Sequence, residues 1–185
     1  MDTAVQEQEA LGKPRRGRLT FYHPNAKGTG TALQLELRMN RNGEDRYDCF
    51  FLEMARQKTA GRDENGRSAA TFDWPAKVTV KLDFLDVCEL LMVLEGKADH
   101  AGGQREGLYH EHGKANTIIS LRRNPEQGGY GLGLSRKGKQ DGQLFKAQIL
   151  LSDAEAIGLR SVFQSALFHL AFRRSLAEAA APDIE

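Results

Sequence analysis

Apolar and polar residues alternate along several short segments of the chain. This period of two is typical of a β-strand with one buried face. The alternating segments are Thr31–Arg38, Leu52–Arg56, Val78–Leu82, Thr117–Arg123, Leu132–Arg136 and Phe145–Leu151. Turn-forming residues lie between them at 40–43, 124–129 and 139–142. The pattern therefore predicts antiparallel strands joined by short turns.

Two other segments predict helices. From about Ser152 to Arg174, apolar residues recur at steps of three and four, which gives a stripe wide enough to cover a sheet. A shorter helix is predicted from about Asp86 to Glu95. Each helix begins with the spacing of a capping box, in which an Asp or Ser is followed three residues later by Glu. The two pairs are Asp86 with Glu89 and Ser152 with Glu155.

The two halves of the chain repeat each other. Phe21-Tyr22-His23 with Lys27 recurs as Leu108-Tyr109-His110 with Lys114. Further along, Leu52–Arg56 recurs as Leu132–Arg136, and the predicted helix start at Asp86 recurs at Ser152. Each copy then consists of four strands followed by one helix. The separation between matching segments shrinks along the chain, which places extra residues in the loops of the first copy, above all at 59–76.

The fold class that follows is α+β, with two ββββα repeats related by pseudo-twofold symmetry and antiparallel sheets packed on helices. One copy alone is too small to bury a core, so we expect the copies to share one, with the sheets outward and the helices inward or between them. The single domain would extend over 17–174. It comprises repeat one (17–96), a linker (97–106) and repeat two (107–174), and we expect flexible tails at 1–16 and 175–185.

Composition and charge narrow the class of protein. A chain of 185 residues that is 40% hydrophobic and 28% charged fits one globular domain. It lacks an apolar run of about 18 residues and a leader pattern at its start. We therefore expect a soluble cytoplasmic protein, compatible with nucleoid association, that has no membrane partner. Cys49 and Cys88 are too few for a disulfide scaffold or a four-cysteine zinc site. The net charge is only +1, but Lys and Arg are concentrated in 13–46 and 105–146, which favours one basic face.

The doubled ββββα pattern resembles the Whirly family and its structural relatives, the PUR-repeat proteins and the kinetoplastid mitochondrial guide-RNA-binding proteins. The resemblance covers roughly residues 18–173. The Whirly motif Lys-Gly-Lys-Ala-Ala-Leu is similar to Lys27-Gly28-Thr29-Gly30-Thr31-Ala32-Leu33, which has one extra residue and lacks the second Lys. These proteins bind single-stranded nucleic acid. The resemblance therefore implies a single-stranded DNA or RNA partner and a homo-oligomer, either a dimer or a tetramer.

Sequence-tolerant binding of a single strand requires cations for the phosphates and aromatic faces for the unstacked bases. Both occur in both copies, and we expect them on the sheet faces. The alternative for each cation is a solvated side chain that protects a strand edge. Alternation leaves open whether Tyr22 and Tyr109 or their neighbours Phe21 and Leu108 face outward, and Trp74 is either a base clamp or packed across the sheet edge. The candidate binding residues are Tyr22, His23, Lys27, Arg38, Arg56, Lys58, Tyr109, His110, Lys114, Arg122, Arg136, Lys137 and Lys139.

Other chemistry has little support in the sequence. His110 and His112 share a strand face, but two imidazoles make a weak metal site. Gly129–Gly133 lacks the flanking strand and helix of a dinucleotide fingerprint, and no catalytic motif occurs, so we expect no enzyme, cofactor or metal. The alternative function is a protein-interaction or assembly module on the same fold. Phe168 and Phe172 extend the second helical stripe beyond what one sheet can cover and predict at least a dimer.

Overall fold

The computed structural model describes residues 17–38, 48–61, 69–126 and 128–172. The tails predicted at 1–16 and 175–185 and the turn at 40–43 lie outside these ranges. In the first half of the chain the elements are β1 (Arg18–His23), β2 (Thr31–Arg38), β3 (Cys49–Thr59), β4 (Thr71–Phe72), the short helix η1 (Trp74–Ala76), β5 (Val78–Leu82) and α2 (Phe84–Leu94). In the second half they are η2 (Gly103–Arg105), β6 (Leu108–His112), β7 (Ala115–Arg123), β8 (Tyr130–Gly138), β9 (Leu144–Leu151) and α3 (Asp153–Phe172).

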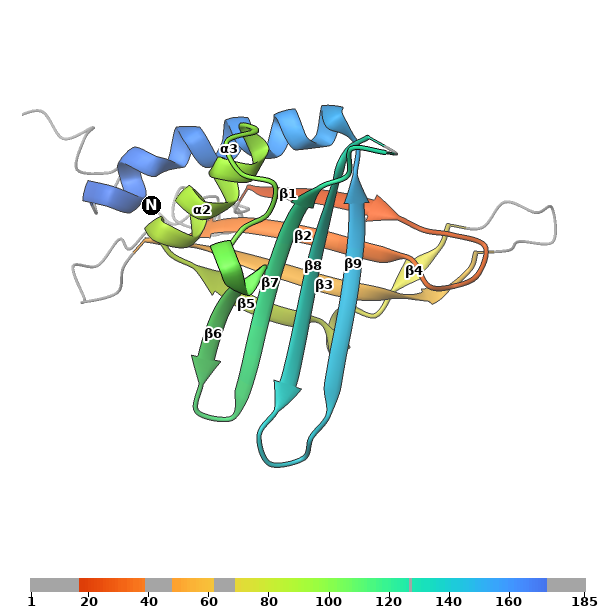
Figure 1. Cartoon of the computed structure of the whole chain (residues 1–185). Helices are drawn as coiled ribbons and strands as arrows, with labels where there is room; N and C mark the ends of the chain where they lie inside the picture. The colour runs from red at the N-terminus through yellow and green to blue at the C-terminus, as the bar shows by residue number, and fades with distance from the viewer. Residues whose placement is uncertain (1–16, 39–47, 62–68, 127, 173–185) are drawn as a thin grey trace, which may run out of the picture.

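The strands form two antiparallel sheets. The first sheet has the order β1-β2-β3-β5, and the short β4 pairs with the far end of β3. The second sheet has the order β6-β7-β8-β9. The predicted sequence of four strands and a helix in each half is confirmed, with β4 and η1 added within the expected insertion at 59–76. Figure 1 shows the strands of the two sheets running crosswise to each other.

The inner faces of the sheets pack against each other in one shared core. Strand alternation puts Leu52 and Met54 of β3 on the inner face of the first sheet, and Leu132 and Leu134 of β8 on that of the second. All four side chains are buried and belong to the same hydrophobic cluster. Apolar residues of both helices join this cluster as well. The prediction that the two copies share a core is therefore confirmed.

The helices do not lie between the sheets, which corrects one expectation. Strand β9 of the second sheet packs directly on β2 and β3 of the first. The helices contact each other and lie together at one end of the second sheet (Figure 1). Two twisted sheets with continuous apolar inner faces can pack on one another crosswise, so the helices need to close only the open end of the core. No helix among the described residues is long and apolar enough to span a bilayer.

Both helices begin with a capping box, but the first begins earlier than predicted. Asp83 is the N-cap of α2, and its side chain and that of Asp86 each accept a hydrogen bond from the backbone N–H of the other. Ser152 and Glu155 make the equivalent pair at the start of α3. The counterpart of Ser152 is therefore Asp83 rather than Asp86, because Asp86 is the third residue of the first helix and not its cap.

Candidate nucleic-acid interface

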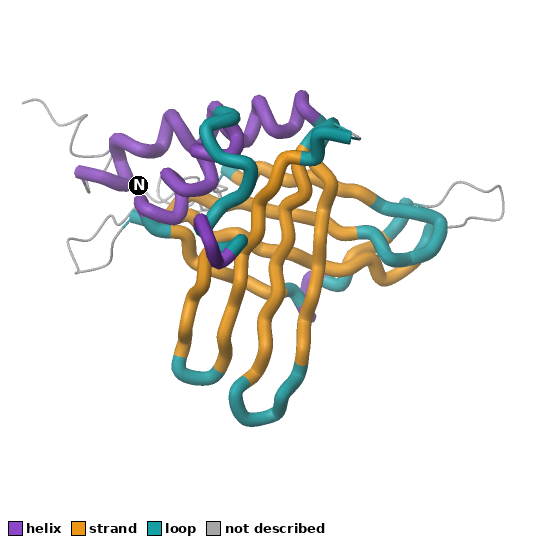
Figure 2. The backbone as a smooth tube through the Cα atoms, viewed as in Figure 1, coloured by secondary structure: helices purple, strands orange, loops and turns teal. Residues whose placement is uncertain are grey.

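The two predicted tyrosines lie on the outer faces of their sheets. Tyr22 pairs with Ala32 and is 56% exposed, and Tyr109 pairs with Ile118 and is 45% exposed. Because the inner faces share one core, the outer faces point in opposite directions (Figure 1, Figure 2). The predicted residues are therefore not gathered on one concave surface. A single strand cannot lie flat across both tyrosines.

His23 and His110 point toward the helices and make equivalent hydrogen bonds with carboxylates. His23 Nε2 lies 2.8 Å from Glu155 Oε1 at the start of α3, and His110 Nε2 lies 2.9 Å from Asp86 Oδ1 at the start of α2. Each histidine thus contacts the helix of the other repeat. The hydrogen bond with Asp86 raises the pKa of His110, although partial burial opposes this. Burial alone would raise the pKa of the Glu155 carboxyl group, but the hydrogen bonds from His23 and Ser152 lower it.

Arg56 and Arg136 also reach across to the other repeat. Arg56 Nε donates a hydrogen bond of 3.0 Å to the Lys146 carbonyl oxygen of β9, and its guanidinium lies 4.6 Å from the centre of the Phe145 ring. Arg136 donates a hydrogen bond to the Thr79 carbonyl oxygen of β5, and burial lowers the pKa of its guanidinium. These contacts between repeats explain why the histidines and arginines recur in both copies. Their recurrence alone therefore gives no support for nucleic-acid binding.

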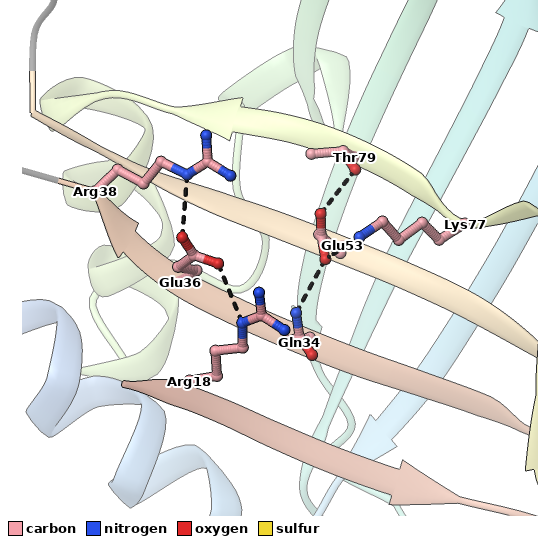
Figure 3. A network of polar contacts seen from close by, with 7 residues as sticks. All are labelled: Arg18, Gln34, Glu36, Arg38, Glu53, Lys77 and Thr79. Carbon is pink, nitrogen blue, oxygen red and sulfur yellow. Dashed lines mark hydrogen bonds and ion pairs between the residues drawn. The ribbon is translucent and has the colours of Figure 1, made fainter. Parts of the chain in front are cut away.

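The outer face of the first sheet contains a buried carboxylate that binds two of its cations. Glu36 is only 5% exposed. Its two oxygens accept hydrogen bonds of 3.1 Å from the Nε atoms of Arg18 and Arg38 (Figure 3). The Arg38 guanidinium also lies 4.4 Å from the centre of the Phe51 ring. Arg38, a predicted phosphate ligand, is thus held by a carboxylate and an aromatic ring.

A second carboxylate occupies the middle of the same face. Glu53 is 9% exposed and accepts hydrogen bonds from Gln34 at 3.0 Å, Lys77 at 2.7 Å and Thr79 at 3.0 Å (Figure 3). Two buried negative charges therefore lie where a phosphate chain would pass over the sheet. The two carboxylates already pair with three cations of this face, so a phosphate would have to compete with them for these cations.

An aromatic cluster lies at the other end of the first sheet's outer face. The Tyr22 ring centre lies 5.5 Å from that of Phe72 and 6.5 Å from that of Trp74, which it meets edge-on. Below these rings, Ala32 and Ala55 form a fully buried floor. Trp74 is therefore packed across the sheet, which is one of the two arrangements that the sequence left open.

The outer face of the second sheet has the same layout and different chemistry. Strand register puts Arg122 at the position of Glu36, and Gly133 at the position of Glu53. Gly133 pairs with Ser120, and Ser135 follows on the same strand, whereas Gly131 is buried beside the side chains of Arg122 and Gln148. Arg122 pairs with Glu106, at 3.1 Å, and both side chains are largely exposed. This face therefore has no buried carboxylate among the described residues.

Two lysines of this face are free of carboxylates. Lys137 of β8 and Lys146 of β9 are exposed, and within the described ranges neither forms an ion pair. Lys146 lies directly beside Ser135, whereas Tyr109 lies on the opposite edge strand. The face thus combines two exposed cations that form no ion pair within the described ranges with an exposed aromatic ring.

The remaining predicted lysines lie at strand ends. Lys27 is in the β1–β2 turn, and Lys58 is near the end of β3. Lys114 lies in the β6–β7 turn, where its carbonyl oxygen accepts a hydrogen bond of 2.9 Å from the backbone N–H of Lys139. The Lys139 side chain forms an ion pair with Glu111. Lys114, Lys137 and Lys139 are therefore brought together at one end of the second sheet.

Two cations of the second sheet were missed by the sequence analysis. Lys146 has a signal, because it is the polar residue between Phe145 and Ala147 in an alternating strand. Arg105 lies in η2, within the predicted linker, where no periodic pattern indicates its direction.

No protein-family model matches the chain, and no curated protein matches it. Solved structures do resemble it. The Whirly protein WHY1 from Arabidopsis thaliana has a TM-score of 0.67 and 18% identity, over 94% of this chain and 98% of that chain. The trypanosome MRP1/MRP2 structure has a TM-score of 0.58 and 20% identity, over 94% and 99%. A guide-RNA-binding protein complex bound to a guide RNA has a TM-score of 0.56 and 20% identity, over 87% and 97%. The chain therefore has the fold of the Whirly proteins and the guide-RNA-binding proteins, as the duplicated pattern predicted.

Proposed function

We propose that the chain binds single-stranded nucleic acid across the outer face of its second sheet. The observation that carries this proposal is the pair of free lysines, Lys137 and Lys146, beside the small residues Gly133 and Ser135. The guide RNA bound in one structure of the same fold supports this class of ligand.

Physical chemistry favours the second sheet over the first. Each phosphate that pairs with a free lysine releases counterions, which makes binding favourable and salt-dependent. On the first sheet, by contrast, Arg18 and Arg38 already pair with Glu36. A phosphate would have to displace this carboxylate, which would then remain buried without its partners. Binding of a phosphate to these arginines would therefore cost free energy.

The test is a salt titration of the variant Lys137→Ala/Lys146→Ala. We expect weaker binding of a labelled single strand. The slope of log K against log salt should flatten by about 0.7 for each lost phosphate contact. Lys97→Ala is the matched control, because Lys97 is exposed at the end of α2 and pairs with Glu95. Unchanged affinity and slope in the double variant, with its Tm intact, would contradict the proposal.

The ligand class is tested in the same assay. Single-stranded DNA, single-stranded RNA and duplexes of the same length are titrated in parallel. The proposal requires that single strands bind more tightly than duplex, because only unstacked bases can contact an aromatic face such as Tyr109.

We also propose that the chain forms a homo-oligomer through α3. Phe168 and Phe172 are exposed near the end of the described helix, with their ring centres 4.9 Å apart. Exposed Ile157 and Val162 occur earlier on the same helix. Apolar helix surface of this kind is usually covered by a partner, and a second copy of the chain is the partner that is always present. This surface favours the assembly-module alternative as an additional property of the same protein.

A further inference from the structure

A shallow cavity of about 290 Å³ opens at the edge of the second sheet. It is lined by Arg105, Gly107, Tyr109 and Ile118. Tyr109 and Ile118 are neighbours across β6 and β7, and both face outward. The wall is therefore an aromatic ring beside an aliphatic side chain, at the border of the face that we propose for nucleic acid.

The shape of this cavity depends on a glycine. A Cβ atom at Gly107 would lie 2.7 Å from Ile118 Cγ2 and 3.1 Å from the Ile119 carbonyl oxygen. The first distance is too short for a real contact and the second is tight, so any side chain at 107 would displace Ile118. The absence of a side chain thus keeps the cavity open down to the backbone.

The loop that carries Arg105 is held in place on both sides. The backbone N–H of Ala101 donates to the Leu121 carbonyl oxygen of β7 at 2.9 Å, and that of Gly102 donates to a Glu89 carboxylate oxygen of α2 at 3.3 Å. Glu106 follows with φ 52°, a left-handed conformation that costs a non-glycine residue energy. Its carboxylate fastens the loop to Arg122. Arg105 is therefore presented at the rim of the cavity by a fixed backbone.

Arg105 is available to a ligand. Its side chain is exposed, and in the described part of the chain it forms no ion pair. A ligand that fits this site has a flat apolar face that packs on Tyr109 and Ile118, and an anionic group within reach of the Arg105 side chain. A nucleotide unit of a single strand has both.

We propose that this cavity is a nucleobase subsite, in which one base stacks on Tyr109 and its phosphate pairs with Arg105. The inference rests on the proposed function and deepens it. The free lysines Lys137 and Lys146 then hold the backbone over the sheet, while the cavity at the β6 edge anchors one base. Stacking on an aromatic side chain tolerates any base, so the subsite adds affinity without sequence preference.

The experiment uses the full chain and a labelled oligothymidine of about 12 nucleotides in which one position is 2-aminopurine. Stacking quenches the emission of this base, and we expect quenching with the wild type and with Tyr109→Phe, which keeps the ring. Tyr109→Leu should abolish the quenching and weaken binding about tenfold without changing the salt slope. Arg105→Ala should instead reduce the slope by about 0.7. Lys97→Ala should change neither the quenching nor the salt slope.

The outcomes separate this inference from the proposed function. If Lys137→Ala/Lys146→Ala weakens binding while Tyr109→Leu and Arg105→Ala leave affinity, slope and emission unchanged, the subsite is wrong and the sheet interface stands. If the wild type binds no single strand at micromolar concentration, both are wrong. Gly107→Ala is an independent check that leaves Tyr109 and Arg105 in place. It should reduce the quenching because Ile118 moves into the cavity, and full quenching in this variant would overturn the subsite.

Discussion

At the scale of single residues, side chains of each repeat contact the other repeat in equivalent ways. His23 and His110 occupy equivalent strand positions, and each pairs with the acid at the third position of the other repeat's helix. Glu155 and Asp86 therefore have two roles, because each also completes the capping box of its own helix by accepting a hydrogen bond from the N-cap backbone N–H. Loss of one carboxylate would weaken a helix start and a contact between repeats together.

The raised pKa of His110 makes its contact with Asp86 depend on pH. A raised pKa means that the folded state binds the proton more tightly than the unfolded chain. The resulting stability is fully present below the unfolded value of about 6.5 and is lost as pH rises through the higher folded value. We expect the Tm of His110→Gln to lie below that of the wild type at about pH 5.5, with a smaller difference at about pH 8.5.

Thermal melts across this pH range measure the effect. His112→Gln is the control, because His112 is exposed on the same strand and, in the described part of the chain, has no ion pair. A Tm difference for His110→Gln that stays constant with pH would show that the imidazole does not act through its charge.

The alternation pattern contains a signal for the inward direction of these residues but none for their partners. Arg56 follows Leu52 and Met54 at every second position, and His23 follows Phe21 in the same way. Alternation places both on the same face as these apolar residues, which argues against the outward, nucleic-acid-binding role that was expected for them. The Lys146 carbonyl oxygen and Glu155 become their partners only through the crosswise packing of distant strands, which no local pattern encodes.

At the scale of elements, the helix starts show how a short pattern can be ambiguous. Asp83, Asp86 and Glu89 are three acids at steps of three, so two overlapping capping boxes fit the sequence. The structure uses the first, because β5 ends at Leu82 and Asp83 is the first residue free to leave the sheet. For α3 only Ser152 is available, and its capping box was predicted correctly.

The apolar surface of α3 leads to a prediction of assembly. Light scattering of the wild type should give a multiple of the chain mass of 20.5 kDa, and Phe168→Glu/Phe172→Glu should give the chain mass itself, because buried carboxylates oppose association. Leu144→Glu places the same charge on an exposed apolar residue of β9 and should leave the mass unchanged. A wild type that scatters as a single chain at micromolar concentration would rule out the proposed oligomer.

At the scale of the whole molecule, the two outer faces differ in charge although the strands beneath them are equivalent. The sequence shows that Lys and Arg are concentrated in one segment of each half. It could not show that Arg18, Arg38 and Lys77 are held by Glu36 and Glu53, because these acids are distant in sequence from several of their partners. Register across three strands decides which cations stay free.

Trp74 can test on which face of the molecule a single strand binds. It is the only tryptophan of the chain and packs beside Tyr22 on the first sheet. We expect its emission to remain constant while the anisotropy of a labelled strand rises, because the strand lies on the opposite side of the molecule. Tyr22→Leu, which removes the neighbouring ring, should change the emission and show that the reporter responds. Quenching of Trp74 by the strand would place the ligand on the first sheet instead.

The exchanged histidine and arginine contacts have a historical consequence. Two separate copies of one repeat, held by the same contacts, would form a homodimer with an exact twofold axis, and every residue of one outer face would recur on the other. A glutamate at one position would then appear on both sides. Fusion into one chain removes this constraint, since each half is encoded separately. Glu36 on one side and Arg122 on the other are thus a difference between the two faces that a symmetric homodimer of one repeat could not have.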